Sequence, residues 1–475
     1  MPESGGMISA RLFVWGMVLI VALGALVLRE VAPAQLIARG SDSERAGILL
    51  EQRFGERIHS SRGQRTPSAP GVVIAALTTG LLGLAVVGSR RSARERVAAA
   101  CVTVVTALCA GGLTALLGLG SPAGVLATIA AGGGLLLGLR ISEATGKPTL
   151  GPLVALPFYL GVAVADIPAV RTAAAAAAVG SVVGWAAAAS LGPVVGRLDK
   201  GPPATARGGR ELGGERGFGR LGWALALTTL VVLAVGAALR PPPLEASDVT
   251  APFGFQIVIR DPEGFRGDGF MPVYRLAHAL QRQEGVERVE SIATLIPEAT
   301  AEQAQNFFLS PLGADPSKGL IAGTDLTRFV FRMDLAPGSG AARALVEQAR
   351  ALSDGILPDS AAALVGGRAA ALVDVRGALW TAHWGLALAL MPAWLALRLL
   401  GRGPRAALVA VALAALAGAA CLGLNALLPN TSPPSRLAPG IALTVAAAIA
   451  GAVAAATSPE SKSDEEAKWA GRSPS

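Results

Sequence analysis

Charged and aromatic side chains are scarce in this sequence. Only 16% of the 475 residues are charged and only 4% are aromatic, whereas Ala, Gly, Val and Leu dominate. A soluble chain of this length would carry more of both. Apolar runs of about twenty residues recur instead, which is the pattern of membrane-spanning helices. The composition therefore excludes an ordinary soluble protein and indicates an integral membrane protein.

Three cysteines and three histidines leave little material for redox, metal or nucleophilic chemistry. The cysteines, Cys101, Cys109 and Cys421, fall within apolar runs and fit neither a disulfide framework nor a zinc site. The stretch ATGKPT (144–149) contains Gly-Lys but lacks the first glycine of a phosphate-binding loop. We therefore expect neither an enzyme nor a cofactor.

The net charge of +8 does not indicate a nucleic-acid partner, because Lys and Arg form no single patch. They lie in short loops between apolar runs, where basic residues set the orientation of membrane helices. Loops 88–96, 140–147, 197–220 and 398–405 are basic, and the short loops that alternate with them contain almost no Lys or Arg. This asymmetry predicts that both termini are cytoplasmic. About ten spans are expected, at 12–28, 71–88, 97–118, 122–139, 149–166, 172–193, 221–239, 377–399, 406–427 and 438–456.

The spans divide the chain into a membrane bundle and two extracytoplasmic segments. The expected parts are a first transmembrane helix (1–29), a short extracytoplasmic segment (30–70), a five-helix membrane bundle (71–196), a basic cytoplasmic loop (197–220), a transmembrane helix (221–239), an extracytoplasmic domain (240–376), three transmembrane helices (377–456) and a disordered cytoplasmic tail (457–475). The first span has an alternative interpretation as a cleaved signal peptide, because Arg11, an apolar core and the small residues VAPA follow one another.

The segment 240–376 contains alternating strand and helix patterns. Strands are predicted at 253–261, 286–294, 327–335 and 361–367, helices at 270–285 and 338–355, and a polar linker after the second strand. The order β-α-β-β-α-β is that of a ferredoxin-like domain, in which two helices cover one face of a four-stranded antiparallel sheet. The predicted fold class is thus an α-helical membrane bundle with one extracytoplasmic α+β ferredoxin-like domain.

This arrangement resembles half of an exporter of the RND superfamily, and the MMPL type in particular, with its relatives that move hopanoids and other lipids. Four stretches carry the resemblance: SDSERAGILLEQRFGE (41–56), GSRRSARERV (88–97), RISEATG (140–146) and LVGGRAAALVDVRGAL (364–379), in which a Gly-Gly precedes small residues and Asp374. The resemblance implies a porter role for the outer domain and a location in the bacterial inner membrane. The chain would be a reduced or atypical member, because the family usually has twelve spans and two large outer modules.

A further departure concerns the acidic residues inside the membrane. The family commonly carries a proton-relay aspartate in its fourth and tenth helices, but AAGGGLLLGL (130–139) and 438–452 contain no acid. Ionisable groups within a membrane are costly and are usually functional. The candidates that remain are Asp166, which closes the fifth span before Arg171, and His383 in the eighth span. The alternative interpretation of Asp166 is an ion pair with Arg171 at the membrane–water interface. That of His383 is an interfacial histidine among tryptophans.

Gly180 and Gly184 form a Gly-x-x-x-Gly pattern that allows close helix packing, either within the bundle or across a dimer.

Two functions remain open. The first is export of a hydrophobic or lipid-like substrate, coupled to protons or to a partner. The second is a non-transporting scaffold or accessory subunit in envelope assembly. The expected partners are the lipid bilayer, the substrate, and a second copy or an RND-like chain.

Overall fold

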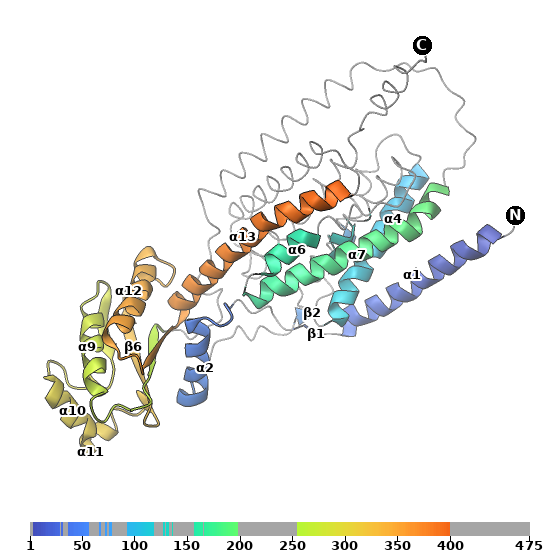
Figure 1. Cartoon of the computed structure of the whole chain (residues 1–475). Helices are drawn as coiled ribbons and strands as arrows, with labels where there is room; N and C mark the ends of the chain where they lie inside the picture. Colours follow the sequence, from blue (N-terminus) through green and yellow to red (C-terminus); the bar gives the residue numbers. More distant parts are fainter. Residues whose placement is uncertain are drawn as a thin grey trace, which may run out of the picture.

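A computed structural model describes residues 3–28, 30–31, 37–56, 66–67, 72–73, 76–77, 93–117, 127–128, 130–132, 135, 156–164, 166–197 and 254–399. Within these ranges the chain forms two parts (Figure 1). Long helices gather in one part, and a smaller α/β domain lies at one end of them. The start of α1 (Glu3–Leu28) lies at the end of the bundle away from that domain.

Besides α1, the long helices are α4 (Ala93–Leu116), α7 (Pro168–Arg197) and α13 (Arg368–Leu399). The shorter helix α6 (Leu156–Ala163) contacts α7 and α13. Two segments of the described chain, Val97–Leu116 and Pro168–Leu191, are long and apolar enough to cross a membrane. The expected spans 221–239, 406–427 and 438–456 lie outside the described residues, and 71–88, 122–139 and 149–166 are described only in part.

Small residues and internal hydrogen bonds hold these helices together. Ala110, Ala127, Ala131 and Ala176 form one fully buried cluster. The Trp15 indole Nε1 donates to the hydroxyl of Ser190 at 3.1 Å, which ties α1 to α7. The buried hydroxyls of Tyr159 and Ser181 lie 2.8 Å apart and tie α6 to α7. Polar groups in a membrane bundle are stabilised in this way by partners on neighbouring helices.

The α/β domain is built on an antiparallel sheet in the order β4-β6-β3-β7. Its strands are β3 (Gln256–Arg260), β4 (Val286–Glu290), β6 (Leu326–Met333) and β7 (Ala362–Gly366), so all four strands predicted in this region are present. Helices α9 (Phe270–Gln281) and α12 (Gly340–Ile356) pack against one face of the sheet. Ile257 and Ile259 of β3 point to that core, and both are fully buried.

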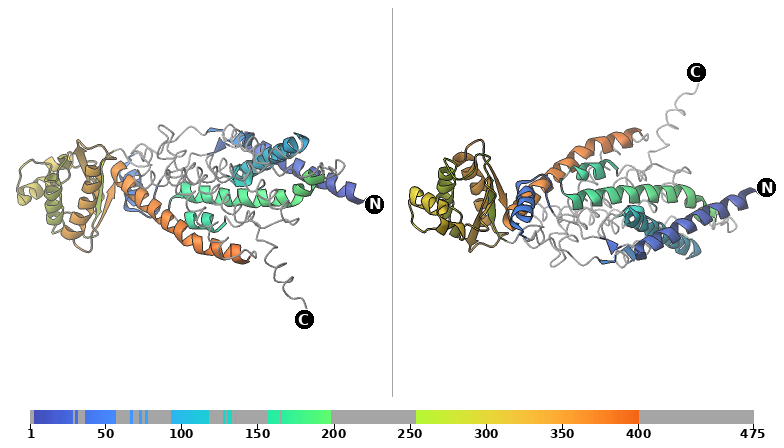
Figure 2. Two further views of the ribbon diagram at one scale, coloured as in Figure 1. Left: turned by 90° about the horizontal axis from the view of Figure 1, so that it is seen from above. Right: turned by 90° about the horizontal axis from the view of Figure 1, so that it is seen from below.

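The opposite face of the sheet is also covered. Helix α2 (Asp42–Phe54) lies on it, and Ala46 and Leu50 pack against Val258, Leu326 and Leu364. Figure 2 shows α2 on the side of the sheet away from α9 and α12. Coverage on both faces explains why β3 reads as a continuous apolar run rather than an alternating one. The segment 30–70, for which no element was predicted, thus supplies a third layer to the domain.

The prediction of a polar linker between the second and third strands is wrong, because this segment contains regular structure. The chain forms α10 (Ala301–Leu309), the single turn α11 (Pro311–Ala314) and the short strand β5 (Ile321–Ala322), which pairs with β6. A capping box begins α10: the Thr300 hydroxyl accepts from Gln303 N at 3.3 Å, and Gln303 Oε1 accepts from Thr300 N at 3.0 Å. Such a box satisfies two of the free N–H groups at a helix start.

We expect Thr300→Ala to destabilise α10 by about 1 kcal/mol, because alanine cannot accept the hydrogen bond from Gln303 N. Hydrogen exchange on the full-length protein checks this through faster exchange of the amides at 301–305. Thr324→Ala is the control, since Thr324 lies in the loop before β6 and caps no helix. Equal exchange in the two variants would contradict the capping role.

Helix α13 begins at Arg368, although a span was predicted only from 377. Gly367 allows this early start, because its φ of +96° turns the chain directly from β7 into the helix. A Cβ at this position would lie 2.0 Å from the Gly254 carbonyl oxygen. One continuous helix therefore runs from the α/β domain into the apolar segment, with no linker between them.

Candidate functional site

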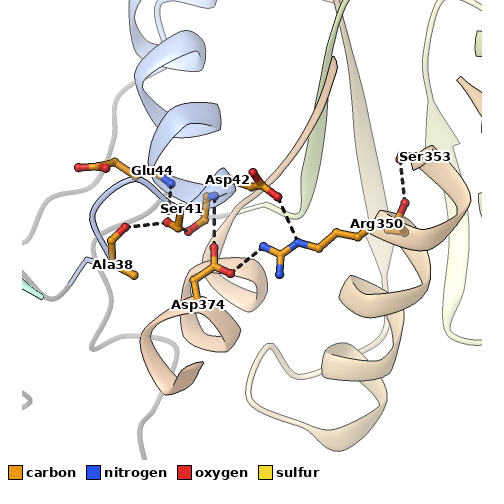
Figure 3. Close-up of polar contacts among 9 residues, drawn as sticks. Ala38, Ser41, Asp42, Glu44, Arg350, Ser353 and Asp374 are labelled. Carbon is orange, nitrogen blue, oxygen red and sulfur yellow. Dashed lines mark hydrogen bonds and ion pairs between the residues drawn. The ribbon is translucent and has the colours of Figure 1, made fainter. Parts of the chain in front are cut away.

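Three segments that are distant in sequence meet where the α/β domain joins the long helices. They are the start of α2, the middle of α12 and the first turns of α13. We call Asp42, Arg350 and Asp374, one residue from each, the junction cluster (Figure 3).

The start of α2 is fixed by its own N-cap. The Ser41 hydroxyl accepts from Glu44 N at 3.3 Å and donates to the Ala38 carbonyl at 2.7 Å. This cap leaves the N–H of Ser43 free to donate to Asp374 Oδ2 at 3.3 Å. A carboxylate at a helix N-terminus is stabilised by the free N–H groups and by the helix dipole. The first turn of α2 thus holds the side chain of Asp374.

Arg350 connects both acids to the outer domain. Its Nη2 lies 2.7 Å from Asp374 Oδ1, and its Nε lies 3.6 Å from Asp42 Oδ2. The Asp374 side chain is only 10% exposed and that of Arg350 26%, so solvent screens their ion pair weakly. Removing one partner of such a pair leaves a poorly solvated charge. The contact with Asp42 is the weaker one, because the Asp42 side chain is 40% exposed and Arg350 Nε forms no hydrogen bond with any residue that the structure describes. The cluster therefore connects the domain to both chain segments mainly through the pair of Arg350 and Asp374.

The other end of α2 makes a second set of polar contacts with the sheet. Gln256 Nε2 donates to both carboxylate oxygens of Glu56 at 2.8 Å, and Arg328 Nη1 lies 3.2 Å from Glu56 Oε2. The Arg328 guanidinium also lies 4.9 Å from the centre of the Phe54 ring. Because α2 is held at both ends, it cannot move independently of the sheet.

In the sequence, Asp374 stood out only as part of a resemblance, and Asp42 and Arg350 were missed. A signal for Arg350 was present. Helix α12 buries Val346, Ala349 and Ser353, and position 350 borders that face. A charged residue beside a buried helix face needs a partner. Within the described ranges, no group of three or more His, Cys, Asp or Glu residues could hold a metal ion.

Asp166 lies in the turn before α7, and its carboxylate pairs with the guanidinium of Arg171. Arg171 Nε also donates to the Ala163 carbonyl at 3.2 Å, and Arg39 N donates to the Asp166 carbonyl at 2.7 Å. The Asp166 side chain is 61% exposed. This turn therefore lies beside the segment that leads into α2, near the outer domain, and a relay role for Asp166 stays a prediction.

His383 lies in α13, nine positions after Asp374. At about 1.5 Å per residue this places it about 13 Å further along the helix than the junction cluster. A relay role for His383 also stays a prediction.

Gly180 and Gly184 lie on one face of α7. A Cβ at Gly180 would lie 2.3 Å from the Ala127 carbonyl oxygen, and one at Gly184 would lie 2.4 Å from that of Ala131. The glycine face of α7 therefore packs directly against the backbone of another helical segment of the same chain. This leaves no room on that face for a second copy.

The fold and this geometry can be compared with known proteins. No protein-family model matches the sequence, and no curated protein sequence matches it. Its structure is similar to that of the hedgehog release protein Disp from the water bear Hypsibius dujardini, with a TM-score of 0.52 and 12% identity over 82% of this chain and 64% of the Disp chain. It is also similar to SecDF, a translocon-associated membrane protein from Thermus thermophilus, with a TM-score of 0.39 and 16% identity over 79% of this chain and 49% of the SecDF chain.

The chain therefore shares its fold with Disp. The resemblance stated from the sequence agrees with this fold. The chain spans less than two thirds of the length of either protein that it matches.

Proposed function

We propose that this chain is an RND-type transporter that exports a hydrophobic or lipid-like substrate across a bacterial inner membrane. The observation that carries the proposal is the junction cluster, set within an RND-type fold. We also propose that the α/β domain is a ferredoxin-like porter domain. The strand order β4-β6-β3-β7, with α9 and α12 on one face, supports this.

The cluster supports a mechanical role for the domain. Helix α13 enters the domain without a break, and α2 is joined to α1 by residues 29–41. Arg350 binds an acid on each of these two segments. A shift of α13 relative to α2 would therefore move the domain or strain these ion pairs. Transporters of this kind work by rocking one rigid body against another.

The energy source is proposed to be a proton gradient or a partner chain. Asp166 and His383 are the candidate relays in the part of the chain that the structure describes. In membrane vesicles with an imposed pH gradient, we expect Asp166→Asn and His383→Ala each to lower the initial rate of export of a fluorescent phosphatidylethanolamine by about tenfold or more. Asp359→Asn, at an exposed acid of the outer domain, is the control.

The outcomes separate the two functions. Unchanged export in both variants would remove Asp166 and His383 as relays. No gradient-dependent export by the wild type would favour the second candidate, a non-transporting scaffold or accessory subunit. One observation favours that second candidate: the described segments Val97–Leu116 and Thr172–Leu191 contain no charged residue. The mass of the detergent-solubilised assembly would show whether a second copy or an RND-like chain accompanies it.

A further inference from the structure

The outer domain contains a cavity of about 450 Å³ between α10, α11, β5 and the loop after β3. This volume is within the range of about 300–1,000 Å³ that is usual for small-molecule sites. It lies in the insertion between β4 and β6, at the end of the domain away from the long helices (Figure 1).

The lining of the cavity is mixed, with apolar side chains on one part and polar groups on the other. Phe265, which is 1% exposed, belongs to the domain core and forms part of the lining. Phe308, Leu309, Pro311 and Ile321 line it as well. Leu309 is 48% exposed, and its neighbour Leu312, outside the lining, is 77% exposed.

One lining residue carries a charge. The Arg266 side chain is exposed and forms no hydrogen bond or ion pair with any residue in the described ranges. The two lining serines need no ligand, because Ser310 Oγ donates to the Phe307 carbonyl at 2.7 Å and Ser317 Oγ to that of Ala314 at 3.0 Å. Thr324 also lines the cavity, so Arg266 is the one charged group of the lining but not its one polar group.

The walls of the cavity are fixed before any ligand arrives. Ser310 ends α10 and begins α11, where its hydroxyl accepts from Gly313 N at 3.3 Å. Gln305 Nε2 donates to the Gly267 carbonyl at 3.2 Å and so ties α10 to the loop that carries Arg266. The Phe308 ring stacks on Phe270 with centroids 6.0 Å apart. A preformed site loses little conformational freedom on binding.

We propose that this cavity binds an anionic single-chain amphiphile, whose acyl chain contacts the apolar walls and whose carboxylate pairs with Arg266. A guanidinium matches a carboxylate in both charge and geometry. Because the cavity lies at the end of the domain away from the long helices, its ligand would be one that has already left the bilayer. That the ligand is the exported substrate rests on the proposed function, whereas the binding itself does not.

The test uses the full chain in phosphatidylcholine nanodiscs, without any ion gradient. Two photoreactive probes are compared, a diazirine-bearing hexadecanoic acid and its methyl ester, and the labelled peptides are identified by mass spectrometry. We expect the acid to label residues within 305–324. Arg266→Gln should raise the concentration of acid needed for half-maximal labelling about fivefold and leave the ester unaffected. Ala314→Trp, at an exposed lining position, should reduce labelling by both probes.

Arg275→Gln is the matched control, because Arg275 is an exposed arginine of α9 outside the lining. If Ala314→Trp does not fold, Leu309→Ser at the exposed rim replaces it. Labelling confined to the membrane helices would overturn the proposal, and so would equal labelling of Arg266→Gln and Arg275→Gln. Since no gradient is applied, a wild type that labels at 305–324 but does not export would refute the proposed function alone.

Discussion

Replacing Arg350 with alanine is expected to loosen the contact between the outer domain and the helices α2 and α13. The substitution leaves Asp374, at 10% exposure, without its cationic partner, and it also removes the contact with Asp42. Breaking one side of a buried ion pair costs about 3–5 kcal/mol, and the 26% exposure of Arg350 places the expected cost at about 2–4 kcal/mol.

Hydrogen exchange on the full-length protein measures this effect directly. We expect protection of amides in the first turns of α2 and α13 to fall by about 30-fold or more, because each 1.4 kcal/mol corresponds to a factor of ten. Arg343→Ala is the matched control on the same helix. Its ion pair with Glu347 is 60% and 56% exposed, so its loss should cost less than about 1 kcal/mol. Similar protection in both variants would refute a structural role for the junction cluster.

A double-mutant cycle with Asp374→Asn isolates the pair itself. Residues in direct contact show interaction energies of about 0.5–3 kcal/mol, whereas independent sites add. Additive effects of Arg350→Ala and Asp374→Asn would show that the two side chains act separately. Export measured in the same variants then tests whether a loosened junction uncouples the outer domain from the membrane helices.

Gly184→Val is expected to disrupt the membrane bundle. The new Cβ would lie 2.4 Å from the backbone oxygen of Ala131, and neither helix backbone can shift easily inside a packed bundle. Overpacking of this kind costs about 3 kcal/mol when the neighbouring atom is backbone. The expected result is a lower melting temperature of the detergent-solubilised protein and less monodisperse material.

The matched control is Gly24→Val in α1. Both glycines lie inside apolar helices, but a Cβ at Gly24 would meet nothing within 4 Å. The intrinsic cost of valine in a helix is the same at both positions and cancels in the comparison. Equal stability of the two variants would show that the close approach of α7 to Ala131 does not support the bundle.

The four strands of the outer domain were predictable because each carries a local pattern. Apolar alternation indicated β4 and β6, and the apolar run before Asp261 indicated β3. Helices α9 and α12 were predicted from their amphipathic periodicity. Their ends differ by a few residues, as at Gln281, where α9 stops before the predicted 285.

Helices α2 and α10 were missed although their capping signals are present. Ser41 begins α2, and Gly55, with φ +66°, ends it. Thr300 and Gln303 form the capping box of α10. These helices were overlooked because their apolar stretches are short and the residues around them are polar. A search for caps rather than for apolar runs would have found both.

The junction cluster could not be derived from the sequence. Asp374 and the N–H of Ser43 are 331 residues apart, and no local pattern encodes such a contact. The positions of Arg350 and Asp374 on their helix faces were accessible, but their pairing depends on how the sheet orients α12 against α13. The close approach of Gly184 to Ala131 likewise depends on the packing of two helices, although the Gly-x-x-x-Gly pattern identified the face involved.

The third layer of the outer domain affects how the protein is made. Glu56 at the end of α2 and Gln256 at the start of β3 are 200 residues apart, so the ribosome completes α2 long before it begins the sheet. The apolar surface of α2 that carries Leu50 is therefore made before its partner Val258 on β3. One face of the sheet is completed by a segment that precedes the whole sheet in the order of synthesis.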